Sequence, residues 1–283
     1  MAQVREIPCR EITEAVRRLF MEANTELPAD LLKTVRDARE RETSSVACSI
    51  LDRILENADV ACREKLPLCQ DTGLAIVFAE IGQDVHVVDG DFPSAVREGV
   101  RQAYRDGYLR KSVCDPLSRV NTGDNTPAIL HTEIVPGHRI RIIAMPKGGG
   151  SENMSGVSML LPAAGWEGIR QHVLQKVAEG AANACAPVLV GVGIGGAMET
   201  AIVLARRALL RTIGEPNGSD ERLRDLERGL LADINALGIG PQGLGGRTTA
   251  LAVHVEMAPC HIASLPVAFQ LQCHAVRHRE AIL

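Results

Sequence analysis

The sequence predicts an α/β protein with a helical N-terminal segment followed by a mixed β-sheet flanked by helices. Apolar residues recur at helical spacing over about residues 1–64, and short apolar runs of strand length alternate with helical patterns over about residues 65–283. No linker, internal repeat or low-complexity tract separates these two parts. We therefore expect a single domain, residues 1–283.

Three helices are expected in the first part, because three sets of apolar residues each mark one buried helix face. The sets are Ile12, Ala15, Val16, Leu19 and Phe20; Leu31, Leu32 and Val35; and Val46, Ile50, Leu51, Ile54 and Leu55. Pro28 breaks the first run, and the hydroxyls of 43–45 offer a cap for the third helix.

The second part predicts strands and helices in alternation. Strands are expected at 74–78, 85–88, 128–135, 139–145, 188–190, 250–255 and 263–269, and helices at 91–108, 166–182, 197–210 and 219–237. The third and fourth of these strands are expected to pair across Pro136–Gly137. Asp91 is a strong N-cap for its helix, with Pro93 in the first turn.

Composition narrows the classes of function. The chain has 46% hydrophobic residues, 2% aromatic residues and a net charge of −4. Few aromatics and no long basic run argue against nucleic acid and anionic membranes as partners. No apolar run reaches the roughly 20 residues of a membrane span, and residues 1–14 lack the apolar core of a signal peptide. We expect a cytoplasmic protein whose eight cysteines do not form a disulfide framework.

The densest group of reactive side chains lies in the stretch Cys69–Thr72, which reads Cys-Gln-Asp-Thr. Pro67 restricts the backbone before it, and Gly73 permits a sharp turn after it. A thiol, an amide, a carboxylate and a hydroxyl in consecutive positions are typical of a functional loop. The alternative is a polar turn with an incidental cysteine.

Three cysteines, Cys69, Cys185 and Cys273, lie at strand or loop junctions beside polar or glycine-rich backbone. A [4Fe–4S] cluster usually takes four thiolates, so a protein that supplies three leaves one iron open to a substrate oxygen. Such a centre suits the elimination of water next to a carboxylate. Spacing alone does not select the ligands, because the sequence contains no CxxC.

The other five cysteines and the histidines are weaker candidates. Cys9, Cys48 and Cys62 are expected to be small core residues, whereas the roles of Cys114 and Cys260 are open. His261 is the strongest histidine candidate, because it lies at a strand junction that we expect to face Cys273.

The segment Gly191–Gly196 matches the glycine pattern of dinucleotide-binding turns, in a strand–turn–helix context. Glu215 follows at nearly the ribose-binding spacing. No second mononucleotide-binding half is evident, which weakens the hypothesis of an NAD-binding oxidoreductase.

Five segments, taken together, resemble one protein family. They are Leu66–Gly73, Asn121–Asn125, Lys147–Asn153, Gly191–Gly196 and the tail from Leu265 to Cys273. In this order, from about residue 10 to the end, they are similar to the class I (iron–sulfur) fumarate hydratase and L(+)-tartrate dehydratase family. The resemblance implies a [4Fe–4S] cluster with one open iron, held by Cys69, Cys185 and Cys273.

The resemblance also implies roles for other residues. Gln70 and Asp71 would contact the substrate, and Asp71 would take part in proton transfer. Gly149 would offer its backbone to the substrate, and His261 would hydrogen-bond it as a second catalytic residue. Arg110 would bind a substrate carboxylate through its guanidinium fork, with the nearby Arg119 of the following polar loop as the alternative.

Single-chain members of the family carry a second, C-terminal domain, whereas this chain ends at Leu283, just past the third cysteine. The resemblance is therefore to the alpha subunit of the two-subunit type, which implies a separate beta subunit, an α2β2 heterotetramer and little activity of the chain alone.

The leading hypothesis is an alpha subunit of a hydro-lyase that reversibly hydrates fumarate to L-malate, a reaction of the tricarboxylic acid cycle. The first alternative is L(+)-tartrate dehydratase, which forms oxaloacetate. Two alternatives of other classes are the NAD-binding oxidoreductase, resting on Gly191–Gly196, and a non-enzymatic iron–sulfur scaffold or sensor.

Overall fold

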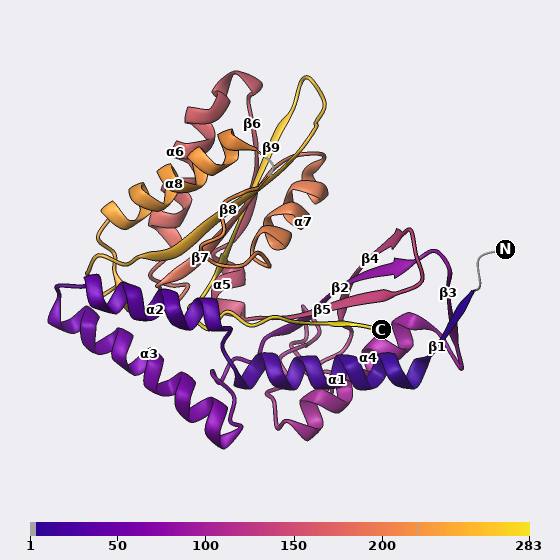
Figure 1. Cartoon of the computed structure of the whole chain (residues 1–283). Helices are drawn as coiled ribbons and strands as arrows, with labels where there is room; N and C mark the ends of the chain where they lie inside the picture. The colour runs from indigo at the N-terminus through magenta and orange to yellow at the C-terminus, as the bar shows by residue number, and fades with distance from the viewer. Residues whose placement is uncertain (1–3, 219) are drawn as a thin grey trace. The chain divides into compact units, whose positions relative to one another are not determined.

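The computed structural model describes residues 4–218 and 220–283, which form two compact units (Figure 1). The first unit holds residues 4–27, 58–149 and 277–283, and the second holds residues 28–57 and 150–276. The chain passes between the units more than once. This division therefore does not coincide with the predicted boundary between the helical part and the α/β part near residue 64. Residues 1–3 of the predicted helical part and residue 219, where a helix was expected to begin, lie outside the described residues.

The first unit is built on a four-stranded mixed sheet. The strand order is β10–β5–β2–β4, formed by Arg279–Ile282, Ile140–Lys147, Leu74–Gly82 and Ile129–Val135. Helices α1 (Cys9–Thr25) and α4 (Phe92–Asp106) pack on one face of this sheet, where alternate residues of β2 and β5 are buried. A smaller parallel pair joins β1 (Arg5–Pro8) to β3 (Val85–Val88).

The second unit is also a mixed sheet flanked by helices. The strand order is β6–β9–β7–β8, formed by Gly156–Leu160, Leu265–Gln272, Val188–Gly195 and Ala250–Ala258. Helices α6 (Gly165–Gly180) and α8 (Glu221–Ala236) pack on one face, and α7 (Met198–Ala208) packs on the other. The remaining elements are α2 (Ala29–Arg41), α3 (Ser45–Glu64), α5 (Gly149–Asn153) and the 3-10 turns η1 (Pro162–Ala164) and η2 (Pro241–Gly243). The predicted α/β class is thus confirmed.

The predicted helices form where local signals are strong. Asp91 caps α4 as expected, since its Oδ1 accepts the Ser94 N–H at 2.8 Å and Pro93 occupies the first turn. In α3 the burial of Val46 was predicted wrongly, because Val46 is 50% exposed and its neighbour Ala47 is fully buried. The buried face of this helix is therefore rotated by one residue from the expected one near its start.

Strand β2 lies between β4 and β5, which corrects the predicted pairing across Pro136–Gly137. β2 runs parallel to β4 and antiparallel to β5, so that Phe78 has His131 opposite it on one side and Ile143 on the other. Turn residues between two strands predict that the chain reverses there. They do not predict whether a third strand enters between the two.

Strand β7 continues to Gly195, five residues beyond its predicted end. Gly191 and Gly193 lie inside the strand, and a Cβ on either would come within about 2.1 Å of the carbonyl oxygens of Ala205 and Ala201 in α7. These glycines let α7 approach the sheet closely. In a dinucleotide-binding fingerprint the first two glycines lie in the turn after the strand, so the NAD-binding hypothesis loses its structural basis.

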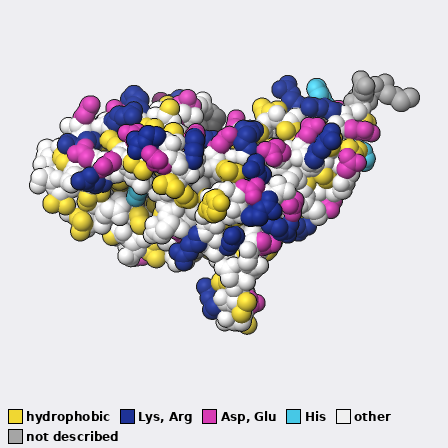
Figure 2. Space-filling model, turned by 90° about the horizontal axis from the view of Figure 1, so that it is seen from below, with side chains coloured by type: hydrophobic (Ala, Val, Ile, Leu, Met, Phe, Trp, Pro, Cys, Tyr) yellow, Lys and Arg dark blue, Asp and Glu magenta, His cyan; other side chains and the backbone are white. Residues whose placement is uncertain are grey.

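In the part of the chain that the structure covers, residues 4–218 and 220–283, no helix is long and apolar enough to cross a membrane. Figure 2 shows acidic and basic side chains interspersed over one face of the molecule. Charged side chains of the described residues also form surface ion pairs, such as Arg39 with Asp52 at 2.7 Å and Arg141 with Glu280 at 2.6 Å.

Candidate active site

Asp71, in the loop that follows α3, has both carboxylate oxygens engaged by backbone N–H groups. Oδ1 accepts a hydrogen bond from Gly73 at 3.0 Å, and Oδ2 accepts one from Gly149 at 2.7 Å. The structure thus brings together Asp71 and Gly149, two of the residues predicted for the site. Two fixed donors orient the carboxylate and leave further lone pairs for a proton or a substrate hydroxyl.

Cys69 and Gln70 begin the same loop. The Cys69 sulfur accepts the Asp71 N–H at 3.4 Å, and its thiol lies 3.6 Å from Oε1 of Gln70. Gln70 is exposed, whereas Cys69 and Asp71 are half-buried. Hydrogen bonds to the ligand sulfurs are one of the factors that set the reduction potential of an iron–sulfur cluster. The Asp71 N–H makes a hydrogen bond of this kind to Cys69.

Three buried side chains hold the main chain of this loop from behind. Nη1 of Arg277 donates to the Asp71 carbonyl at 2.7 Å. The Tyr104 hydroxyl lies 2.8 Å from the Thr72 carbonyl and 2.9 Å from the Gly73 carbonyl. Nδ2 of Asn125 also donates to Gly73, at 3.2 Å.

The sequence motifs do not predict these three supporting residues. Burial raises the pKa of Tyr104 above its usual value, so its hydroxyl stays a hydrogen-bond donor at any physiological pH. Asn125 ends the segment Asn121–Asn125, which carries part of the family resemblance but predicts no role for Asn125, and Arg277 lies in none of these segments. The nearest signal was Tyr104 itself, an aromatic residue on the buried face of a predicted helix.

Gly73 closes the loop as predicted. Its φ is +78°, and a Cβ there would lie 2.6 Å from the carbonyl carbon of Lys147. Both the backbone conformation and the close approach of β5 therefore require glycine at this position.

Of the two arginine candidates, the structure joins Arg110 to the loop. The Thr72 hydroxyl donates to the Arg110 carbonyl at 2.8 Å, while the Arg110 side chain is exposed and pairs with no carboxylate among the residues that the structure describes. Arg119 lies in an exposed turn in which Asp115 accepts the N–H groups of Leu117 and Ser118. Of the two candidates, Arg110 is thus the one that is directly connected to the Asp71 loop.

In the second unit, Cys185 and Cys273 lie at the same end of neighbouring strands. Cys185 is in the turn before β7 and Cys273 directly follows β9, and the two strands pair there through Leu189 and Gln272. His274 connects the two positions, because its Nδ1 lies 3.1 Å from the Cys185 carbonyl. Neither cysteine is in a disulfide. Two of the three predicted thiol ligands are therefore neighbours.

His261 lies at the other end of this sheet. It is exposed in the connection between β8 and β9, and β8 ends opposite Gly195, at the far end of β7 from Cys185. The eight residues of β7 span about 23 Å at the rise of a strand. The expectation that His261 faces Cys273 is therefore wrong within one chain.

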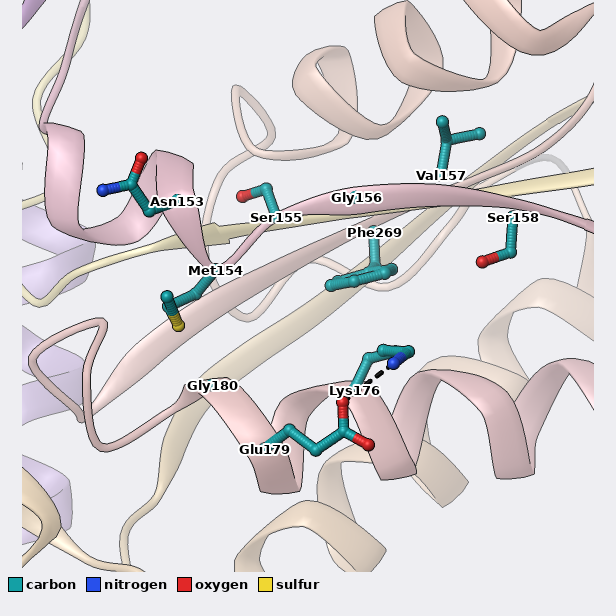
Figure 3. Close-up of a pocket in the computed structure, with 10 residues that line it drawn as sticks. All are labelled: Asn153, Met154, Ser155, Gly156, Val157, Ser158, Lys176, Glu179, Gly180 and Phe269. Carbon is teal, nitrogen blue, oxygen red and sulfur yellow. Dashed lines mark hydrogen bonds and ion pairs between the residues drawn. The ribbon is translucent and has the colours of Figure 1, made fainter.

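Two cavities of the second unit contain none of the residues predicted for the cluster or the dicarboxylate. One, of about 390 Å³, lies between β6 and α6, where Figure 3 shows the ion pair of Lys176 and Glu179 below Phe269. The other, of about 850 Å³, is lined by α2, α8, β8 and the segment 212–216. No three His, Cys, Asp or Glu side chains in the described ranges are grouped as a metal site, so the cluster ligation stays a prediction.

Comparison with known proteins identifies the family. Residues 13–282 match the protein family described as fumarate hydratase (Fumerase). The chain belongs to the fumarate hydratase (Fumerase) family. This confirms the resemblance drawn from the motifs, and with it the class of reaction, a hydro-lyase.

Relatives match over nearly the whole chain. A Methanocaldococcus jannaschii protein that carries the provisional name L(+)-tartrate dehydratase subunit alpha is 43% identical over 273 residues, covering 94% of this chain and 95% of its own. The L(+)-tartrate dehydratase subunit alpha of Escherichia coli K12 is 34% identical over 277 residues, covering 96% of this chain and 90% of its own. The Shigella sonnei protein of the same name matches equally well.

Proposed function

We propose that the chain is the alpha subunit of an iron–sulfur-dependent hydro-lyase that reversibly hydrates fumarate to L-malate. The observation that carries the proposal is the Asp71 carboxylate, oriented by Gly73 and Gly149 next to a thiol and joined through Thr72 to Arg110. L(+)-tartrate is the second candidate substrate, because the relatives at 34–43% identity carry the name L(+)-tartrate dehydratase. Both substrates are C4 dicarboxylates, so each offers a carboxylate to a basic residue.

Cys69, Cys185 and Cys273 would hold a [4Fe–4S] cluster. Their chemistry fits that group: thiolates are its usual ligands, none of the three is in a disulfide, and two already lie at one end of a sheet. When bound, the cluster supplies a Lewis-acidic open iron.

The protein's own groups bind the dicarboxylate and move the proton. Arg110 forms a forked pair with one substrate carboxylate, and Gln70 hydrogen-bonds the substrate beside Cys69. Asp71 transfers the proton of the carbon next to the one that carries the departing hydroxyl. In dehydration this C–H bond and the C–O bond break, and water leaves. The Gly149 N–H donates to Asp71 at 2.7 Å and fixes the orientation of that carboxylate.

His261 requires a second copy of the chain if it is to hydrogen-bond the substrate, because it lies about 23 Å along β7 from the Cys185 end. An α2β2 assembly with a separate beta subunit provides such a copy. The names of the relatives as alpha subunits support a beta partner. A role in the tricarboxylic acid cycle and a cytoplasmic location accompany the fumarate assignment.

The experiment is an anaerobic assay of the complex purified with its co-expressed beta subunit, with fumarate and L(+)-tartrate offered separately. We expect turnover of at least one of them, with the ratio of kcat/KM values deciding between the two. The isolated alpha chain with intact cluster should show little activity. A complex that carries the cluster and turns over neither substrate would contradict the proposal.

A further inference from the structure

Two buried side chains connect the loop of Asp71 to the segment that carries Arg110. The Thr72 hydroxyl donates to the Arg110 carbonyl at 2.8 Å. Asn125 connects the same two segments: its Oδ1 accepts the N–H groups of Ser112 and Val113 at 2.7 and 3.2 Å, and its Nδ2 donates to the Gly73 carbonyl at 3.2 Å. All of these residues belong to the first unit.

The orientation of the Asn125 amide follows from its partners. Two N–H donors identify the oxygen end, so the NH₂ end must face the Gly73 carbonyl. Asn125 is fully buried and has φ +62°, a left-handed conformation that asparagine adopts more readily than most residues. Burial makes these hydrogen bonds costly to lose, because water cannot replace them.

The main chain at Arg110 is thus held on both sides. Before it, Leu109 is 2% exposed in the core under α1 and α4. After it, Ser112 and Val113 are bound to Asn125. The side chain of Arg110 is exposed on this fixed backbone. A guanidinium on a fixed backbone loses less conformational freedom when it binds a carboxylate.

We propose that Thr72 and Asn125 are positioning residues that set the place of Arg110 relative to Asp71 and thereby the affinity of the site for a dicarboxylate. The proposal rests on the proposed function. Neither side chain touches the substrate. They act through the main chains of Gly73 and of residues 110–113.

The test is the Thr72→Val variant in the complete alpha–beta complex with its cluster. Valine keeps the shape of threonine and removes the hydroxyl. We expect KM for the dicarboxylate to rise roughly 3- to 10-fold, about the value of one hydrogen bond, with kcat changed by less than about 2-fold. KM rises without a change in kcat when the lost carboxylate contact stabilises the bound substrate and the transition state equally.

Two further variants separate positioning from general loosening of the fold. Thr72→Ser restores the hydroxyl and should restore KM. Thr13→Val is the matched control, because the Thr13 hydroxyl also donates to a main-chain carbonyl of the first unit, that of Ala95 at 3.1 Å, but between α1 and α4. It should leave KM and kcat unchanged.

The coupling to Arg110 is tested with a double-mutant cycle. If Thr72 acts through Arg110, Thr72→Val should change KM far less in an Arg110→Ala background than in the wild type. Asn125→Gly is an independent second variant, because glycine accepts φ +62° and removes the hydrogen bonds of the amide to Gly73, Ser112 and Val113. It too should raise KM more than it lowers kcat.

The outcomes are distinguishable. An unchanged KM in Thr72→Val and Asn125→Gly, or full additivity with Arg110→Ala, would overturn the positioning role while leaving the hydro-lyase intact. A wild-type complex that carries the cluster but converts neither dicarboxylate would overturn the proposed function, and the positioning role with it.

Discussion

Nη1 of Arg277 donates a hydrogen bond of 2.7 Å to the main-chain carbonyl of Asp71, across a separation of 206 residues. The same nitrogen donates to Oδ1 of Asn24 at 3.2 Å, and the arginine side chain is 1% exposed. A residue near the C-terminus therefore supports the loop that carries the predicted catalytic carboxylate. This long-range contact makes the geometry of Asp71 depend on the fold of the whole first unit.

Arg277→Met should lower the free energy of unfolding by about 1–3 kcal/mol, because the Asp71 carbonyl and the Asn24 amide lose their buried donor. It should also lower kcat/KM of the complex, since Asp71 is no longer held from behind. Urea denaturation and anaerobic kinetics measure the two effects. Arg5→Met is the matched control, because Arg5 donates to the His138 carbonyl at 3.3 Å on the surface; an equal loss in both variants would refute the supporting role.

Tyr104→Phe should cost about 1–2 kcal/mol of unfolding free energy, because the Thr72 carbonyl is left without its buried donor. The ring itself stays, so packing against Phe20 at 6.2 Å should survive. Tyr108→Phe is the control. Because Tyr108 is 91% exposed, this substitution should change the free energy of unfolding by less than about 0.5 kcal/mol. Equal denaturation midpoints for wild type and Tyr104→Phe would show that the hydroxyl carries no stabilisation.

Asp71→Asn should reduce kcat at least about 100-fold, the usual value of a positioned acid or base, while the fold is retained. The amide preserves one acceptor oxygen for Gly73 or Gly149, but it cannot carry the proton. Asp115→Asn is the control, because Asp115 also accepts two backbone N–H groups but in an exposed turn. Substantial activity in a cluster-replete Asp71→Asn complex would remove Asp71 from the proton-transfer step.

Gly193→Ala tests the structural interpretation of the glycine motif. The added Cβ would lie 2.0 Å from the Ala201 carbonyl, so α7 must shift, and we expect a loss of at least about 2 kcal/mol of stability. Gly229→Ala in α8 is the control: its Cβ would have its nearest neighbour at 4.0 Å, and the stability should rise by up to about 1 kcal/mol.

Calorimetric titration of the wild type with NAD should show no binding. Tight NAD binding that Gly193→Ala abolishes without destabilisation would support the dinucleotide hypothesis instead.

The pH dependence of stability should include a contribution from Asp106. Hydrogen bonds from Arg105 and Arg17 lower its pKa from 3.8 to about 2. Because the folded-state pKa is depressed, this contribution is present above pH 4 and is lost as the pH falls toward 2. The stability difference between the wild type and Asp106→Asn, measured by urea denaturation, should therefore narrow from pH 5 to pH 3. A difference that is constant or widens over this range would contradict the assignment.

Sequence alone predicted the local features well. The Asp91 cap, the turn at Gly73 and the loop from Cys69 to Asp71 each depend on neighbouring residues, and the structure has them as expected. The insertion of β2 between β4 and β5 was missed, because strand order depends on contacts between distant segments.

The supporting residues of the site were missed for the same reason. Arg277 is 206 residues from Asp71, and Asn125 is 52 residues from Gly73, so no short motif contains either pair. His261 was expected near Cys273, its neighbour in the sequence pattern, but β9 carries the chain to the other end of the sheet between them. Two residues at opposite ends of an eight-residue strand are close in the sequence but far apart in the structure.

The most direct test of the central claim is the iron and acid-labile sulfide content of the chain, purified without oxygen together with its beta subunit. The account predicts about four of each per alpha chain. Cys69→Ser, Cys185→Ser and Cys273→Ser should each lower that content. Cys62→Ser should not, because Cys62 is exposed on α3, where a core residue was wrongly predicted. A well-folded complex that contains neither iron nor sulfide, even after anaerobic reconstitution, would contradict the account.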